Sequence, residues 1–384
     1  MSLIVDEHRE YLSDLSRIAA FRKAVREVVR PGDVVVDLGS GTGILGLLAC
    51  QAGAKHVYSV DEGSIVELIR DIARANRVED RLHVLKGLST RITLPEPAGV
   101  IVADQIGRFG FDAGILEYFA DARQRLLRPD ARAIPSRIDL WVAPVSHPGL
   151  WQQIEFWAHR PAGFDFSPAR AIAANTGYPV KLSRKHLLGK PVAGISLDTL
   201  AQGSRPINFS VTIPATRAGV LHGIGGWFSA RLSPTVTMTN SPLARQRINR
   251  RNVFFPVDPP VRLPRGSQVR ITLSILPKEV VVTWTVEIHS RPAKNRPSTI
   301  IAQCTHSTIK GMLISTEDLM RTHPNSTPVL SPWGKARQTV LELCAGGRRL
   351  CEIERTVWQR HPDLFPSLAD AATFTAEVVT RYAR

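Results

Sequence analysis

The sequence predicts an α/β fold with a doubly wound parallel sheet, followed by an all-β barrel-type domain and a small helical C-terminal module. Three observations predict this order. Apolar, β-branched runs alternate with helical segments over residues 33–142, as they do in doubly wound sheets. Beyond about residue 138, strand-like runs punctuated by proline and glycine take over. Residues 333–384 return to the apolar spacing of amphipathic helices.

The elements of the first region follow from their periodicity. A helix is expected over residues 8–30, where apolar side chains recur about every 3.6 residues until Pro31-Gly32 ends the pattern. Strands are expected at 33–38, 57–60, 82–85, 99–103 and 138–142, and the helices between them at 44–52, 65–75 and 116–127. Pro129-Asp130 is expected to turn the chain.

Strand-like segments dominate the second region, at 208–213, 220–227, 267–276 and 280–289. Residues 290–299 are expected to form a loop, and 323–332 a polar linker that contains proline. These changes of pattern predict three domains, at residues 1–137, 138–322 and 333–384.

Composition is that of a globular protein, with 43% hydrophobic and 22% charged residues over 384 positions. No apolar run approaches the roughly 18 residues of a membrane span, and the N-terminus lacks the apolar stretch of a secretory signal. The four cysteines show no CxxC spacing, which predicts neither a metal site nor a disulfide framework. We therefore expect a cytoplasmic protein without a membrane partner.

A glycine-rich turn follows the first predicted strand, with Gly39, Gly41 and Gly43 preceded by Asp37. Dinucleotide folds use G-x-G-x-x-G to seat a pyrophosphate on a helix end, whereas an acid before the loop would repel a phosphate. Asp61 ends the next strand, where a carboxylate can accept both ribose hydroxyls. The combination is typical of Rossmann-like class I methyltransferases and implies S-adenosyl-L-methionine as the cofactor. The alternative is a nucleotide fold without methyl transfer.

From His8 to His289 the chain resembles the protein arginine methyltransferases, on residues 8–17, 53–61, 86–89, 132–137 and 163–167. The resemblance implies that Arg17 pairs with the methionine carboxylate of the cofactor. It further implies that Asp37 and the three glycines wrap the methionine end, and that Asp61 holds the ribose. Three more residues complete the expected cofactor site: Glu62, Leu88 and Ser89. Because residues 163–167 resemble a stretch near the family's dimerisation arm, a homodimer is expected.

The acceptor side departs from this family, which supplies two glutamates on one loop. Here Asp104 takes the first position, and Ala113 takes the second with Asp112 beside it. The catalytic candidates are therefore Asp104, Asp112 and Asp14. The family's Thr-His-Trp loop falls at about residues 248–250, which lack its histidine and tryptophan. Three interpretations remain open. The acceptor is an arginine-like nitrogen, or it is another nucleophile whose anionic part is held by Arg108 or Arg250. In the third interpretation the chain is a non-catalytic scaffold.

Residues 336–384 resemble a winged-helix-like module of the PqqD type, which presents precursor peptides to modifying enzymes; a structural cap is the alternative. The expected substrate is a peptide or protein, which includes a ribosomal natural-product precursor. The net charge of +15 leaves nucleic acid as a possible partner and RNA methylation as an alternative function. Lys and Arg are spread along the chain without a recognisable nucleic-acid module, which does not favour this alternative.

Overall fold

Residues 4–291 and 299–383 are described by a computed structural model. The chain divides into two units, Met1–Met312 and Leu313–Arg384. The loop expected at 290–299 lies mostly outside the described residues. Within the part of the chain that is described, no helix is long and apolar enough to cross a membrane.

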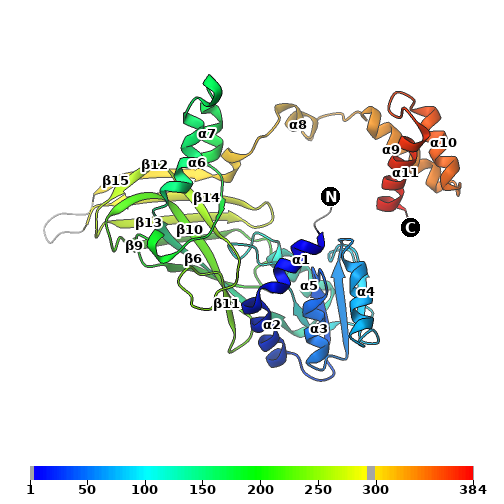
Figure 1. Ribbon diagram of the computed structural model, residues 1–384, viewed down its shortest axis with the longest axis horizontal. Helices are drawn as coiled ribbons and strands as arrows, with labels where there is room; N and C mark the ends of the chain where they lie inside the picture. The colour runs from blue at the N-terminus through cyan, green and yellow to red at the C-terminus, as the bar shows by residue number, and fades with distance from the viewer. Residues whose placement is uncertain (1–3, 292–298, 384) are drawn as a thin grey trace. The chain divides into compact units, whose positions relative to one another are not determined.

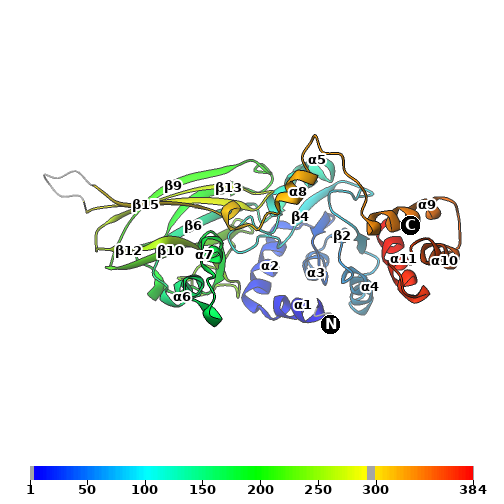
Figure 2. The same cartoon turned by 90° about the horizontal axis from the view of Figure 1, so that it is seen from above.

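A parallel sheet forms the first half of the larger unit, in the order β3-β2-β1-β4-β5. Its strands are β1 (Val34–Leu38), β2 (His56–Asp61), β3 (Leu82–Lys86), β4 (Ala98–Val102) and β5 (Leu127–Ile134). Helices α3 (Ile44–Gln51) and α4 (Val66–Ala75) cover one face, and α5 (Ile115–Arg125) covers the other (Figure 2). β1 and β4 are buried throughout because both faces are covered. The predicted doubly wound sheet is confirmed.

The expectation of one continuous helix over residues 8–30 was wrong, because the chain forms two helices there. α1 (Ile4–Ser13) and α2 (Leu15–Val28) meet at Asp14. The Asp14 carboxylate accepts a hydrogen bond from the backbone N–H of Arg17 at 3.1 Å, which caps α2. A polar residue that offers the backbone this bond ends one helix and begins the next.

The turn expected at Pro129-Asp130 is also wrong, because both residues lie within β5. Ala98 of β4 pairs with Leu127 and Val100 pairs with Arg132, so the residues between them bulge out of the ladder. β5 is the edge strand of this sheet, where a proline need not donate a hydrogen bond.

Two antiparallel sheets form the second half of the larger unit, which confirms the all-β region. One sheet has the order β7-β12-β10-β6-β8, with β11 paired to β10, and the other has the order β15-β14-β13-β9. The first contains β6 (Arg137–Val145), β7 (Tyr178–Val180), β8 (Val192–Asp198), β10 (Gly219–Arg231), β11 (Thr237–Thr239) and β12 (Asn252–Leu263). The second contains β9 (Ile207–Pro214), β13 (Gln268–Leu276), β14 (Val281–His289) and β15 (Ile300–Ser307). The sequence did not indicate β12, in which three prolines mask the strand pattern.

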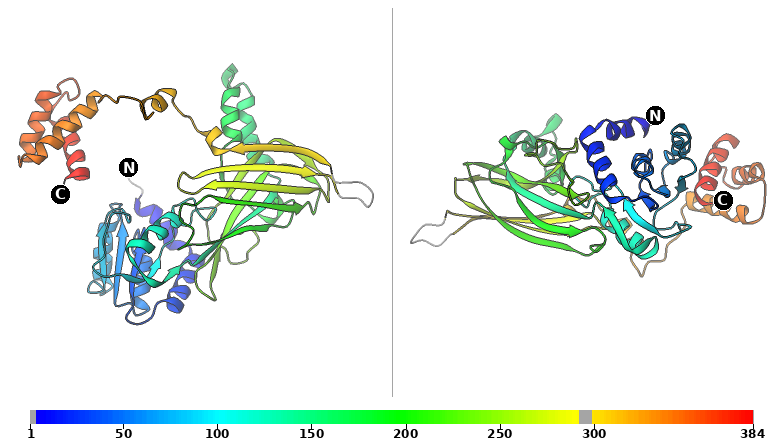
Figure 3. Two further views of the ribbon diagram at one scale, coloured as in Figure 1. Left: turned by 180° about the vertical axis from the view of Figure 1, so that it is seen from behind. Right: turned by 90° about the horizontal axis from the view of Figure 1, so that it is seen from below.

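A helical arm projects from the antiparallel sheets between β6 and β7 (Figures 1 and 3). It contains α6 (Pro148–Glu155) and α7 (Ser167–Ala174). Arg170 of α7 ties the arm to its base, because its guanidinium donates to Glu155 at 3.1 Å and to Asp258 at 2.7 Å.

The smaller unit is helical, as expected. It contains α8 (Thr316–Arg321), α9 (Pro332–Ala345), α10 (Leu350–Arg360) and α11 (Leu368–Tyr382). Its own core includes Val340, Ile353, Val357 and Phe365. The predicted linker at 323–332 lies between α8 and α9, and its last residue begins α9.

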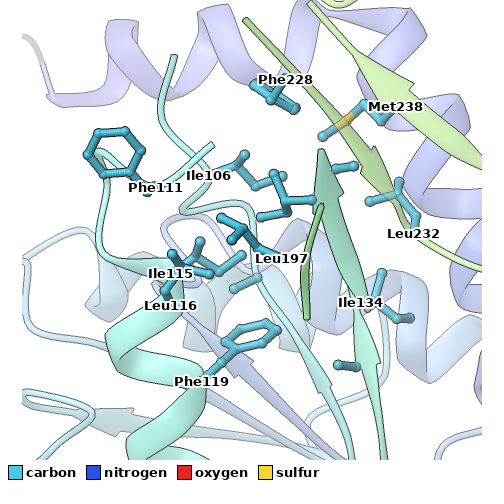
Figure 4. Packing of buried hydrophobic residues seen from close by; sticks show 14 of the residues in the cluster. Ile106, Phe111, Ile115, Leu116, Phe119, Ile134, Leu197, Phe228, Leu232 and Met238 are labelled. Carbon is cyan, nitrogen blue, oxygen red and sulfur yellow. The ribbon is translucent and has the colours of Figure 1, made fainter. Parts of the chain in front are cut away.

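One continuous core joins the parallel sheet to the antiparallel sheets. Ile106 and Phe111, from the loop after β4, belong to the same buried cluster as Phe228 of β10 and Met238 of β11 (Figure 4). These side chains are almost fully buried. The loop that carries Asp104 is therefore anchored in the core at the junction of the two halves.

Candidate active site

The glycine-rich loop between β1 and α3 requires glycine at each of its three positions. Gly39, Gly41 and Gly43 have φ values of +63°, +55° and +79°, in the left-handed region that other residues rarely adopt. A Cβ on Gly41 would lie 2.5 Å from the His8 imidazole, and one on Gly39 would overlap the Gln105 amide. The loop is thus packed tightly beneath α1 and the loop after β4.

Asp37 lies fully buried below this loop. One carboxylate oxygen accepts a hydrogen bond from the N–H of Gly46 at 3.0 Å, and the other has no partner. Burial raises the pKa of Asp37 to about 7, against the opposing effects of the Gly46 hydrogen bond and the charge of Arg17. The hydroxyl of Ser40 is also buried without a hydrogen bond. Unpaired buried polar atoms beneath a glycine loop are suited to a polar ligand.

Asp61 ends β2 and holds the glycine loop from the other side. Its two carboxylate oxygens accept hydrogen bonds from the N–H groups of Gly41 at 2.9 Å and Gly63 at 2.8 Å. Glu62 follows it and is exposed, while Leu88 and Ser89 follow β3 and are half-buried. These positions lie beyond the carboxyl ends of β2 and β3, the edge at which doubly wound sheets bind ligands.

A cavity of about 770 Å³, here called the larger cavity, opens beside the glycine loop. Its size is within the roughly 300–1,000 Å³ of small-molecule sites. The predicted site residues that line it are Asp14, Arg17, Gly39, Gly41, Asp104 and Asp112. Those that do not line it are Asp37, Gly43, Asp61, Glu62, Leu88 and Ser89. The structure thus brings the three catalytic candidates together with three of the nine predicted cofactor residues, Arg17, Gly39 and Gly41.

Asp104, which lines this cavity, is held by two arginines. Arg250 donates to both of its carboxylate oxygens, at 3.1 and 2.9 Å, and the Nε of Arg17 also donates to it. The Asp104 side chain is only 7% exposed. Burial by itself would raise the pKa of Asp104, but the charges and hydrogen bonds of Arg250 and Arg17 hold that pKa below its ordinary value. Two guanidinium groups on one carboxylate leave the cluster with one net positive charge.

The other two catalytic candidates are occupied by backbone hydrogen bonds. One oxygen of Asp112 accepts from the N–H groups of Arg108 and Phe109, both at 2.8 Å, which closes the turn after β4. Asp14 caps α2 with one oxygen and accepts from the N–H of Asn249 with the other, at 2.6 Å. Both oxygens of Asp14 are therefore occupied, whereas the second oxygen of Asp112 accepts no hydrogen bond from the described residues.

Several lining residues had no role in the sequence prediction. His8 and Tyr11 of α1 form one wall of the larger cavity, and Gln105 forms another. His8 and Tyr11 fall within the segment that carries the family resemblance, so that signal was present. Lys181 and Arg247 line a neighbouring cavity of about 400 Å³ and belong to no recognisable motif.

Comparisons with known proteins agree with this geometry. Residues 22–138 match the family described as Ribosomal protein L11 methyltransferase (PrmA). Protein arginine N-methyltransferase 6 of Danio rerio is 28% identical over 288 residues, which cover 71% of this chain and 82% of that protein. Protein arginine N-methyltransferase 1 of Schizosaccharomyces pombe is 28% identical over 292 residues, with the same two coverages. The chain is an S-adenosylmethionine-dependent class I methyltransferase that resembles the protein arginine methyltransferases.

This methyltransferase shares its fold with two solved structures. Protein arginine methyltransferase 10 of Arabidopsis thaliana, described as a uniquely open conformation, has a TM-score of 0.67 and 22% identity, covering 78% of this chain and 97% of that one. The Trypanosoma brucei PRMT1 enzyme–prozyme heterotetrameric complex with AdoHcy gives the same TM-score and coverages at 21% identity. S-adenosylmethionine is the cofactor of this methyltransferase, as its sequence predicted.

Proposed function

We propose that this methyltransferase methylates a nucleophile other than an arginine guanidinium on a peptide or protein. The observation that carries the proposal is the bidentate bond of Arg250 to Asp104. An arginine acceptor requires a carboxylate that holds its guanidinium in line with the methyl group. By the family resemblance Asp104 is that carboxylate, and the chain's own Arg250 already occupies it.

Charge supports the same conclusion. The cluster of Asp104, Arg17 and Arg250 carries one net positive charge, in a largely buried position. A second positive charge about 4 Å away is repelled by ~4 kcal/mol at the effective dielectric of a protein surface. A neutral or anionic nucleophile avoids that repulsion. The relatives are named as enzymes that act on proteins, which supports a peptide or protein as the carrier of the nucleophile.

The residues of the glycine loop fit the methionine end of S-adenosylmethionine, which supplies an electrophilic methyl group on a sulfonium. The fit is supported by the unpaired oxygen of Asp37 and by the left-handed glycines, which let a ligand approach the backbone closely. We propose that Arg17, Asp37 and the three glycines hold this end, and Asp61 with Glu62 the ribose. Leu88 and Ser89 are proposed to contact the adenine.

The test is methyl transfer from radiolabelled S-adenosylmethionine to a peptide set that differs only in the central residue, with Lys, His, Asp, Glu, Ser, Cys and Arg compared. We expect label on a residue other than arginine, and label on arginine only in the Arg250→Ala variant, in which Arg17 alone remains bound to Asp104. Arginine methylation by the unchanged protein would overturn the proposal. Cofactor binding without transfer to any peptide would favour the scaffold function instead. The Gly41→Arg variant, which should not bind the cofactor, is the negative control.

We also propose that the protein is a homodimer formed through the arm of residues 148–174. The arm exposes Phe164 and Phe166, of which Phe164 is 69% exposed. Leu12 and Leu15 at the junction of α1 and α2 are exposed as well, so an apolar surface is available on the body for the arm of a second copy. Exposed apolar side chains that gather on a projecting element are typical of protein interfaces.

The helical unit Leu313–Arg384 is proposed to bind the substrate peptide outside the modified residue, such as the leader of a natural-product precursor. Its core is separate from that of the larger unit, and Trp333, Trp358 and Tyr382 are exposed on it. Truncation after Met312 is expected to slow methylation of long precursors and to leave short peptides unaffected. Equal loss for long and short peptides would contradict this role.

A cytoplasmic location is proposed from the cysteines. All four cysteines are free. Burial raises the pKa of Cys50 and of Cys304 to about 11, which keeps both as unreactive thiols. Thiols of this kind are normal in a reducing compartment. Cell fractionation tests the location, and secretion of the protein would contradict it.

A further inference from the structure

The cavity of about 400 Å³, here called the smaller cavity, lies next to the larger one. The two share Asp14, Asn249 and Arg250. The smaller cavity is otherwise lined by the junction of α1 and α2, by Lys181 after β7, by Arg247 and Ile248 before β12, and by Asn252, the first residue of β12. A chain bound in the smaller cavity therefore passes beside the Asp104 cluster.

Positive charge dominates the walls of the smaller cavity, which hold Lys181, Arg247 and Arg250 against Asp14 alone. Lys181 donates only to the amide oxygen of Asn249, at 3.3 Å, and Arg247 only to the backbone oxygen of Leu182, at 3.3 Å. Among the described residues, no carboxylate lies within 4.0 Å of either side chain. Both cations thus face the cavity with neutral partners.

The lining of the larger cavity contains further cations. Arg108 and Arg251 line it, and the nearest carboxylate oxygen to the Arg108 guanidinium, that of Asp112, is 3.9 Å away. Glu7 and Glu10 of α1 also line this cavity, but neither lines the smaller one. The smaller cavity is therefore the more positive of the two.

Asp14 offsets only one of the three positive charges in the lining of the smaller cavity. Asp14 accepts two backbone hydrogen bonds, and Asp104 beyond it is bound by two arginines. Guanidinium groups bind carboxylates through paired hydrogen bonds, and ammonium groups bind them as point charges. The carboxylate side chains of a ligand could thus bind Lys181 and Arg247, to which no carboxylate among the described residues is bound.

We propose that the smaller cavity binds an acidic segment of the acceptor peptide, with its carboxylates on Lys181 and Arg247. This inference rests on the proposed function and names the substrate class for it. The lining contains no aromatic side chain, whereas sites for single-stranded nucleic acid pair their cations with aromatic residues on which bases stack. The cavity therefore favours an acidic peptide over RNA.

The test measures binding without catalysis, by fluorescence anisotropy of the full chain with S-adenosylhomocysteine present. The probes are fluorescein-labelled 12-residue peptides, one rich in glutamate and one rich in lysine. We expect the glutamate peptide to bind at least tenfold more tightly. The double variant Lys181→Glu/Arg247→Glu should lose at least tenfold in this affinity. The control Lys185→Glu/Arg245→Glu makes the same change of net charge at exposed cations outside both cavities, and should change it less than twofold.

Three results would overturn the inference: equal losses in the two double variants, equal binding of the two peptides, or displacement of the glutamate peptide by a 12-nucleotide oligouridylate at lower concentration than by unlabelled peptide. S-adenosylhomocysteine affinity is measured in parallel and should change less than twofold in both variants. If the protein binds the glutamate peptide but transfers no methyl group to any peptide, that result would count against the proposed function and not against the acidic site. Normal transfer with no preference for the glutamate peptide would count against the acidic site alone.

Discussion

Arg250 and Asp104, 146 positions apart in the chain, form a bidentate ion pair at 3.1 and 2.9 Å in the wall of the larger cavity. Arg17 binds the same carboxylate, so one acid serves two guanidinium groups. The arrangement resembles an acceptor arginine already in place, supplied by the chain itself. It links the loop after β4 to the loop before β12, and the proposed exclusion of an arginine acceptor rests on it.

Asp104→Asn is expected to destabilise the protein by about 3–5 kcal/mol, because it leaves two buried guanidinium groups without a counter-charge. Arg250→Met should cost less, since it leaves the neutral pair of Asp104 and Arg17. Urea unfolding of the two variants measures this order. A loss in Arg250→Met as large as that in Asp104→Asn would contradict it.

Cofactor affinity should rise with pH through about 7. The pKa of Asp37 is raised to about 7 by burial, and the positive charge of the bound cofactor would lower it, so the ionised form binds better. Calorimetric titration with S-adenosylmethionine between pH 5.5 and 7.5 measures the trend. Asp37→Asn should flatten it, and a flat profile in the unchanged protein would refute the role of Asp37.

The same shift has a consequence for stability without cofactor. In the folded protein the pKa of Asp37 lies above the value of about 3.9 that an unfolded chain has. The stabilisation of the fold by Asp37 is therefore fully present below about pH 3.9 and is lost as the pH rises through 7. Asp37→Asn removes this loss. The melting temperature of Asp37→Asn relative to the unchanged protein should therefore be higher at pH 8 than at pH 5.

Gly41→Ala should weaken cofactor binding at least tenfold and leave the fold intact. A side chain at a φ of +55° costs about 1–2 kcal/mol, and its Cβ would lie 2.5 Å from His8. Calorimetry gives the affinity and circular dichroism the fold. Gly149→Ala in α6 is the matched control, because nothing lies within 4 Å of its Cβ. Unchanged affinity in Gly41→Ala would remove the glycine loop from the cofactor site.

Phe164→Ser/Phe166→Ser on the arm should convert a dimer to a monomer, because it removes exposed apolar surface that a second copy would bury. Light scattering after size-exclusion chromatography measures the mass. Ile309→Ser, an exposed apolar residue outside the arm, should leave the mass unchanged. A monomeric unchanged protein would contradict the homodimer.

Much of the fold could be predicted because its signals are local. The buried strands β1 and β4 are continuous apolar runs, and β13 alternates between buried and exposed side chains. The break at Asp14 was not predicted, because the apolar period continues through it and only a hydrogen bond to the N–H of Arg17 marks the new helix. β5 was misread because its bulge, which is set by the pairing with β4, accommodates Pro129.

By itself, the sequence determined the methyltransferase fold and its cofactor, and it predicted that the methyl donor binds beside Gly39, Gly41 and Gly43, since glycine spacing and the preceding acid are local properties of the chain. Only the tertiary structure decided which side chains surround Asp104. Asp104, Arg17 and Arg250 come from three distant segments, and their charges interact only after folding brings them into one buried cluster. Burial then strengthens each interaction, so the pKa of Asp104 depends on neighbours that no motif contains.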